Sequence, residues 1–205
     1  MMKYASKFSI IIFSAVIVSL LASDIRAKET ITWMEAVAPP FYIHDGELQG
    51  QGYQDIITTL IKKQLPQYEH RHIKATISRH YQQWKEGKHA CSLAMFKTPE
   101  RQEFTYFSIP SVFTLPTVLI VRKDRFSNFG GTETISLAEL LKSNKFVIGR
   151  SNNRSYGLEF DNTLNVYGNG SNIFVYEGPE LSRNLFKMLL AGRIDALAGL
   201  PEEAM

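Results

Sequence analysis

Apolar runs and amphipathic segments alternate along the chain after residue 27. Short runs rich in β-branched and aromatic residues predict strands at residues 30–34, 69–77, 146–149, 172–176 and 193–199. Helical spacing and capping residues predict helices at residues 53–61, 78–86, 136–141 and 179–191, and residues 162–170 read as a polar loop. The first helix carries one apolar stripe, which includes Ile56 and Leu60. Strands that alternate with helices predict an α/β fold with mostly parallel sheets.

A polar corner interrupts the apolar pattern in the middle of the chain, between residues 90 and 124. The run 91–96 predicts a buried strand that breaks off before Thr98. Thr98 can cap a helical turn, and Pro99 fits its first position because the missing N–H costs nothing there. Arg101 then lies in a turn whose free backbone amides also favour an anion. A long strand is expected to lead from this corner to Asp124.

The first 27 residues have the layout of a secretory signal peptide. Lys3 and Lys7 precede an unbroken apolar run, residues 8–22, which is too short for a comfortable membrane span. We expect cleavage after Ala27, with Ser23 as a second choice, and an uncleaved N-terminal anchor is the alternative.

Composition excludes some classes of function. The chain has 205 residues and 44% hydrophobic content, enough for one sizeable core or two small lobes. The formal charge is +3, but removal of the predicted signal peptide leaves 20 basic and 19 acidic residues. This balance argues against a nucleic-acid partner.

Cysteine and histidine give no metal site or cofactor site. Cys91 is the only cysteine, so the chain has no internal disulfide, and its apolar neighbours indicate a small core residue. His70 and His72 fall on one face of a predicted strand, with His80 nearby, but no carboxylate or cysteine accompanies them at ligand spacing. We therefore expect solvated histidines and no metal.

The polar corner resembles the amino-acid-binding cluster of periplasmic solute-binding proteins, family 3. The resemblance rests on the Thr-Pro-Glu-Arg sequence at residues 98–101, on Phe107-Ser108, and on the Val-Arg-Lys-Asp end of the strand at 121–124. It extends over about residues 30 to 205, and a subgroup of the family shares the Phe-Lys-Thr-Pro-Glu-Arg corner. It implies a two-lobed periplasmic binding protein-like II fold with lobes at 28–122 and 123–205. We expect this fold to be truncated at the C-terminus, because family members continue and return to the first lobe.

The resemblance also implies a ligand site between the lobes. In that site Arg101 grips a carboxylate, Thr98 and Ser151 add hydroxyl groups, and Phe41 stacks on the ligand. The remaining candidates for ligand binding are Phe96, Glu35, Asn152 and Glu202. The residues alone leave other readings open: a surface salt bridge for Arg101, a hydrophobic plug for Phe41, and an ordinary βα turn at 150–157.

Two departures from the family pattern concern the ligand. Phe96 stands where amino-acid binders carry a hydroxyl, and Leu200 stands where they carry the aspartate that holds the α-amine. Glu202 or Glu35 would have to substitute for that aspartate. A carboxylate without the amine, a modified amino acid and a peptide fragment are therefore alternatives to a standard amino acid.

The resemblance implies a monomeric periplasmic substrate-binding protein that delivers a small carboxylate-bearing, amino-acid-like solute to the membrane permease of an ABC transporter. One alternative is a sensory module for a membrane receptor, and a second is a dehydratase-like enzyme on the same fold. No His/Asp or paired-carboxylate spacing demands an acid/base pair, so we predict no catalytic residue and no enzymatic activity.

Overall fold

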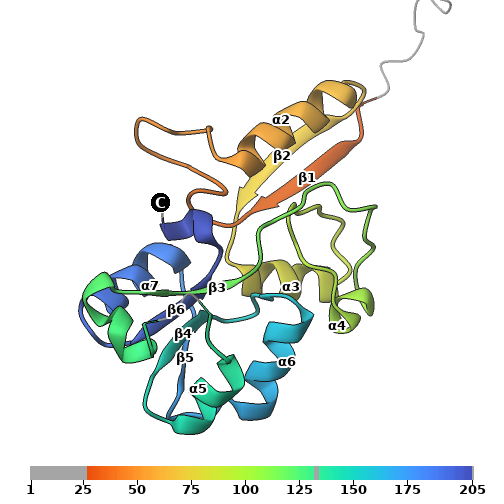
Figure 1. Ribbon diagram of the computed structural model, residues 1–205. Helices are drawn as coiled ribbons and strands as arrows, with labels where there is room; N and C mark the ends of the chain where they lie inside the picture. Colours follow the sequence, from red (N-terminus) through yellow and green to blue (C-terminus); the bar gives the residue numbers. More distant parts are fainter. Residues whose placement is uncertain (1–26, 132–133, 205) are drawn as a thin grey trace, which may run out of the picture.

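The structure, a computed structural model, describes residues 27–131 and 134–204 (Figure 1). Except for Ala27, the predicted signal peptide lies outside the described residues. Two separate sheets organise the rest. The strands are β1 (Thr30–Glu35), β2 (Glu69–Lys74), β3 (Val118–Val121), β4 (Ile148–Ser151), β5 (Ile173–Tyr176) and β6 (Ala196–Gly199).

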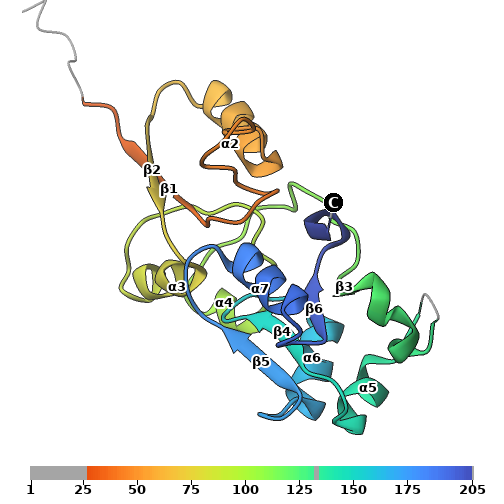
Figure 2. The same cartoon turned by 90° about the vertical axis from the view of Figure 1, so that its left-hand side faces the viewer.

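The smaller sheet pairs β1 with β2 in parallel, from Thr30 opposite Glu69 to Glu35 opposite Lys74. Helix α2 (Tyr53–Gln64) connects the two strands and runs alongside them, as Figure 2 shows from a second side. The helix is confirmed, but its buried residues are Gln54 and Thr58, whereas Ile56 and Leu60 are 51% and 56% exposed. Part of the predicted apolar stripe therefore faces solvent.

The larger sheet has the strand order β3-β6-β4-β5. Strand β4 pairs in parallel with β5 and β6, and only β3 among these four strands runs antiparallel to its neighbour. The prediction of an α/β fold with mostly parallel sheets is confirmed. Helices α5 (Leu137–Ser143), α6 (Leu158–Tyr167) and α7 (Leu181–Leu190) accompany this sheet.

Alternate residues of the larger sheet face two different cores, as the strand pleat requires. Ala196 and Ala198 of β6 join the core beneath α5 and α6, and Leu197 between them joins the core beneath α7. In β4, a Cβ on Gly149 would lie 2.4 Å from Ile194 Cδ1 and 3.2 Å from Leu185 Cδ2, so glycine allows the close packing on the α7 side. The larger unit is thus a sheet covered by helices on both faces.

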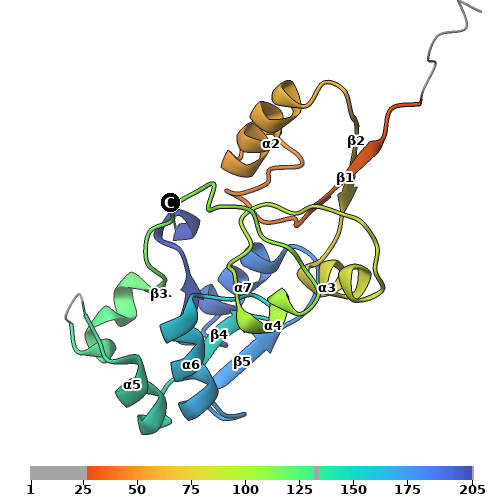
Figure 3. The same cartoon turned by 90° about the vertical axis from the view of Figure 1, so that its right-hand side faces the viewer.

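The short helices α3 (Ile77–Lys85) and α4 (Pro99–Gln102) lie between the two sheets in the chain, whereas η1 (Lys123–Phe129) follows β3 and η2 (Pro201–Ala204) follows β6. The predicted caps are confirmed, because Thr98 Oγ1 accepts from the Arg101 N–H at 3.3 Å and Ser136 Oγ accepts from Glu139 N–H at 3.3 Å. In Figure 3, α3 and α4 lie close to the larger sheet, and η2 lies near the loop that precedes α2.

Four sequence predictions about elements are wrong or too long. Residues 91–96 form no strand, because the run contacts β1 through Cys91 alone, which exchanges backbone hydrogen bonds with Thr32 and Met34, both at 2.7 Å. Cys91 is accordingly exposed and not a core residue. The predicted loop at 162–170 is helical to Tyr167, since Leu164 is buried against the sheet. The strand predicted at 69–77 ends at Lys74. The long strand predicted to lead to Asp124 is only the four residues of β3.

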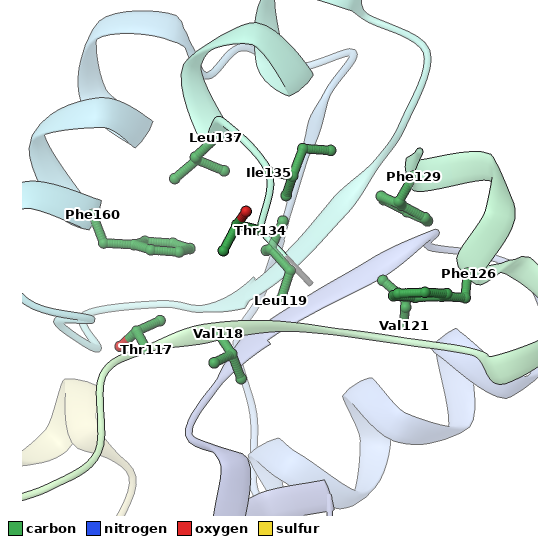
Figure 4. A pocket seen from close by; sticks show the side chains of 10 residues that line it. All are labelled: Thr117, Val118, Leu119, Val121, Phe126, Phe129, Thr134, Ile135, Leu137 and Phe160. Carbon is green, nitrogen blue, oxygen red and sulfur yellow. The ribbon is translucent and has the colours of Figure 1, made fainter. Parts of the chain in front are cut away.

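An apolar pocket of about 310 Å³ lies beside β3 (Figure 4). Its lining comes from β3, η1, residues 134–137 and α6: Thr117, Val118, Leu119, Val121, Phe126, Phe129, Thr134, Ile135, Leu137 and Phe160. None of the predicted ligand-binding residues contributes to it. Within residues 27–131 and 134–204, no helix has the length and apolar character needed to cross a membrane.

Candidate functional site

Arg101 is buried, with 3% of its surface exposed. Its Nε donates to the Tyr81 hydroxyl, its Nη1 to the Phe96 carbonyl oxygen at 2.5 Å, and its Nη2 to the Asn153 carbonyl oxygen at 3.0 Å. The guanidinium carbon also lies 5.3 Å from the centre of the Tyr81 ring. The alternative of a surface salt bridge is wrong, because the charge is buried and all these partners are neutral.

The turn that follows β4 brings the second group of predicted residues to this arginine. Ser151 is the last residue of β4, and Asn152 donates its N–H to the Tyr176 carbonyl oxygen at 2.8 Å. The next residue, Asn153, accepts from Arg101 and donates its side-chain amide to Ser78 Oγ at 3.1 Å. Through these contacts the turn joins the corner, α3 and the larger sheet. It also lies at the carboxyl end of a parallel strand, where α/β sheets usually bind ligands.

Ser151 is unusual within this turn. It is fully buried, and its Oγ has no hydrogen-bond partner among the described residues. Its backbone N–H donates to the Tyr156 hydroxyl at 2.8 Å, which fixes the position of the turn. A buried hydroxyl without a hydrogen-bond partner is costly, so packing alone does not explain a serine at this position.

Phe41 contacts the same turn from the loop before α2. Its ring is buried, packs edge-to-face on Tyr53 at 5.4 Å, and lies 5.8 Å from the guanidinium carbon of Arg154. Arg154 forms a two-pronged ion pair with Glu203 of η2, with N–O distances of 2.9 and 2.6 Å. Phe41, Arg154 and Glu203 therefore link the loop, the turn and η2.

Charge and burial act on the groups around η2. Burial alone would lower the pKa of Arg154, but the hydrogen bonds and charge of Glu203 outweigh it and raise that pKa. Burial raises the pKa of Tyr53, and the neighbouring Glu202 and Glu203 raise it further. The Tyr53 hydroxyl and Glu202 Oε2 are both buried without a hydrogen-bond partner among the described residues.

Glu35 has partners other than these residues. Its carboxylate pairs with His72 Nδ1 at 2.5 Å and lies 3.9 Å from His44 Nδ1, in a polar pocket of about 260 Å³ under α2. The predicted role of Glu35 as a ligand residue finds no support in these contacts. His72 is exposed to solvent although it also bonds Glu35, and the half-buried His70 accepts from the Trp33 indole N–H at 3.0 Å.

His80 lies within α3, is buried and packs against Trp84. Among the described residues, no group of three or more His, Cys, Asp or Glu side chains is arranged to hold a metal ion.

Several residues of the site escape sequence reasoning. Tyr81 and Asn153 hold Arg101, and Arg154 and Glu203 form the buried ion pair. Tyr81 and Glu203 belong to no pattern in the chain, and Asn153 and Arg154 lie in the predicted turn at 150–157 but have no predicted role of their own. Tyr53 is the first residue of a predicted helix, and Glu203 directly follows the candidate ligand residue Glu202.

Comparison with known proteins supports the fold. The chain matches no family model and no curated protein. Among solved structures, it is similar to an ancestral arginine-binding protein bound to arginine, with a TM-score of 0.63 and 21% identity over 85% of this chain and 71% of that one. Holo ArgBP from T. maritima has a TM-score of 0.62 and 22% identity, over 88% of this chain and 73% of that one. The ancestral amino acid-binding protein AncCDT-1, a precursor of cyclohexadienyl dehydratase, has a TM-score of 0.63 and 20% identity, over 88% of this chain and 74% of that one.

The chain therefore has the type II fold of periplasmic amino-acid-binding proteins, as the resemblance in the sequence implied. The neighbours named here are binding proteins, and one of them is the precursor of an enzyme.

Proposed function

We propose that this protein binds a small carboxylate-bearing, amino-acid-like solute at Arg101, as the periplasmic substrate-binding protein of an ABC transporter. The main observation is that Arg101 is buried without a counter-ion, since no Asp or Glu lies within 4.0 Å of its guanidinium among the described residues. A buried charge without a counter-ion is costly, and three neutral acceptors leave two of the five guanidinium N–H groups for a ligand. A carboxylate satisfies both requirements through a two-pronged contact.

The neighbouring unpartnered groups fit the rest of such a solute. Ser151 Oγ would donate to the carboxylate, as Thr98 would from the corner, and Asn152 belongs to the same turn. Glu202 Oε2 would accept from an ammonium group and so replace the aspartate that amino-acid binders carry at the position of Leu200. Phe41 and Tyr53 would form the apolar wall.

The same contacts suggest how the solute is enclosed. With lobes at 28–122 and 123–205, the hydrogen bond between Arg101 and Asn153 joins one lobe to the other. A solute bound to Arg101 would favour this closed arrangement, and the hinge segments would absorb the motion. We propose that the closed monomer then docks on a membrane permease after export through the predicted signal peptide.

A thermal-shift screen tests this proposal. The test compounds are amino acids, short peptides, organic acids and polyamines. They are applied to the wild-type protein, to Arg101→Gln and to the control Arg183→Gln, whose arginine is exposed and pairs with Glu180. A compound at a hundred times its dissociation constant adds about 2.7 kcal/mol of stability. We expect a carboxylate hit that Arg101→Gln loses and Arg183→Gln keeps. A hit that survives in Arg101→Gln would contradict the proposal.

A further inference from the structure

The guanidinium of Arg154 lies inside a box made by other parts of the chain. Glu203 binds it with two hydrogen bonds, and the Phe41 and Tyr156 rings lie 5.8 and 5.0 Å from its central carbon. The arginine side chain is 18% exposed, and that of Glu203 is 2% exposed. We call Phe41, Tyr156 and Glu203 the cation box.

Two aromatic faces and a buried carboxylate are the chemistry by which proteins capture a cation from solution. The carboxylate is held independently of Arg154, because Glu203 also accepts from Ser182 Oγ at 2.8 Å and from the Leu200 N–H at 2.9 Å. At Gly199, a Cβ would lie 3.1 Å from Glu203 Oε2, so the backbone closely borders the carboxylate. The box would therefore keep its shape without its occupant, and such preorganisation favours binding.

The cation box adjoins the proposed carboxylate site. Arg154 directly follows Asn153, the residue that accepts from Arg101. Phe41 is shared between the box and the apolar wall, where it packs against Tyr53. The distal part of a solute held at Arg101 would reach the side of the site that Arg154 now fills.

We infer that the cation box is a subsite for a cationic side chain that Arg154 occupies from within, so that the protein rejects solutes carrying a guanidinium group. This inference rests on the proposed function, because the box completes the same site. Arg154 is then a specificity-determining residue, and its removal would convert the protein into a binder of guanidinium compounds.

The test is calorimetric titration of wild-type protein and Arg154→Ala with L-arginine and with L-citrulline, its neutral isostere. We expect Arg154→Ala to bind L-arginine at least tenfold more tightly than wild type does, with no such gain for L-citrulline. The exposed control Arg183→Ala should behave as wild type. Adding Glu203→Gln to Arg154→Ala should abolish the gain, because the carboxylate of the box is then lost.

A second measurement separates this inference from the proposed function. Ethylguanidinium has no carboxylate, so its binding to Arg154→Ala depends on the cation box alone, with N-ethylurea as the neutral control. We expect ethylguanidinium to raise the melting temperature of Arg154→Ala and not that of wild type. If Arg154→Ala is unfolded, the same titration should restore its cooperative unfolding transition.

Two outcomes overturn the inference. One is an Arg154→Ala protein that responds equally to ethylguanidinium and N-ethylurea, even while Arg101-dependent solute binding persists. The other is wild-type protein that binds L-arginine as tightly as Arg154→Ala does. A selective response to ethylguanidinium without any carboxylate ligand would instead support the box and contradict the proposed function.

Discussion

Nη2 of Arg101 donates a hydrogen bond to the carbonyl oxygen of Asn153 at 3.0 Å, across 52 residues of sequence. This contact joins the polar corner to the turn at the carboxyl end of β4. The Asn153 side chain extends the connection to Ser78 at the start of α3. The candidate site is therefore assembled from segments that only the folded chain brings together, and substitutions within it should separate binding from stability.

Ser151→Ala should reduce affinity without loss of stability. The Ser151 hydroxyl is buried and has no partner among the described residues, so its removal deletes an unsatisfied group. We expect the free energy of unfolding to stay constant or rise by up to about 1 kcal/mol, and solute affinity to fall roughly five- to tenfold. Urea denaturation and calorimetric titration measure the two effects. Ser143→Ala, which removes a hydroxyl bonded to the Leu140 carbonyl oxygen, should show the opposite behaviour.

Gly52→Ala should disturb the Phe41 wall. A Cβ at Gly52 would lie 2.2 Å from the carbonyl oxygen of Phe41, and a backbone oxygen cannot turn away as a side chain can. We expect a loss of about 1–3 kcal/mol in unfolding free energy, together with weaker solute binding. Gly170→Ala is the matched control, because a Cβ there meets nothing within 4 Å. Equal behaviour of the two variants in denaturation would show that the Phe41 loop is not packed as described.

The ion pair between Arg154 and Glu203 should make stability sensitive to acid. Burial alone would raise the pKa of Glu203, but the hydrogen bonds and charge of Arg154 outweigh it and hold this pKa below the ordinary value of 4.5. The stabilisation is therefore complete above pH 4.5 and is lost as the pH falls through the folded-state pKa. Glu203→Gln should cost about 3 kcal/mol at neutral pH and remove this part of the acid sensitivity. Denaturation at several pH values, with the exposed Glu180→Gln as control, checks this.

His80 should produce a second and separate pH effect. Burial lowers its pKa from 6.5 to about 4, so the folded protein keeps the ring neutral where the unfolded chain binds a proton. Stability should fall by roughly 3 kcal/mol as the pH drops from 6.5 to 4, because the unfolded state then holds the extra proton. His80→Leu should flatten the stability curve in this window, whatever its effect on stability at pH 8. A slope unchanged by the substitution would mean that His80 titrates normally in the folded state.

Local chemistry explains what could be predicted from the sequence. The caps at Thr98 and Ser136 depend on residues within one helical turn, and both predictions are confirmed. The α/β fold follows from the alternation of apolar runs and helical spacing, and the solved structures confirm it. The run beginning at Cys91 was misassigned because a strand needs a partner along its length, and only one residue of this run reaches β1.

Long-range pairing explains what could not be predicted. Arg154 and Glu203 are separated by 49 residues, and nothing near either residue signals that they meet. Glu35 was grouped with the ligand residues, but His72, 37 residues away, binds its carboxylate instead. The sequence marks Arg101 as a candidate ligand residue, whereas nothing in it signals that Tyr81 and the Asn153 carbonyl oxygen hold this side chain.

The most direct test of the central claim is a cycle between ligand and protein, in which the tightest-binding solute and its primary amide are titrated into wild-type protein and Arg101→Gln. If Arg101 receives the carboxylate, wild type should prefer the acid over the amide by roughly ten- to a hundredfold, as expected for a charge-assisted hydrogen bond. Arg101→Gln should lose most of that preference. An acid-to-amide ratio that is the same in both proteins would contradict the account, because the carboxylate would then be recognised elsewhere.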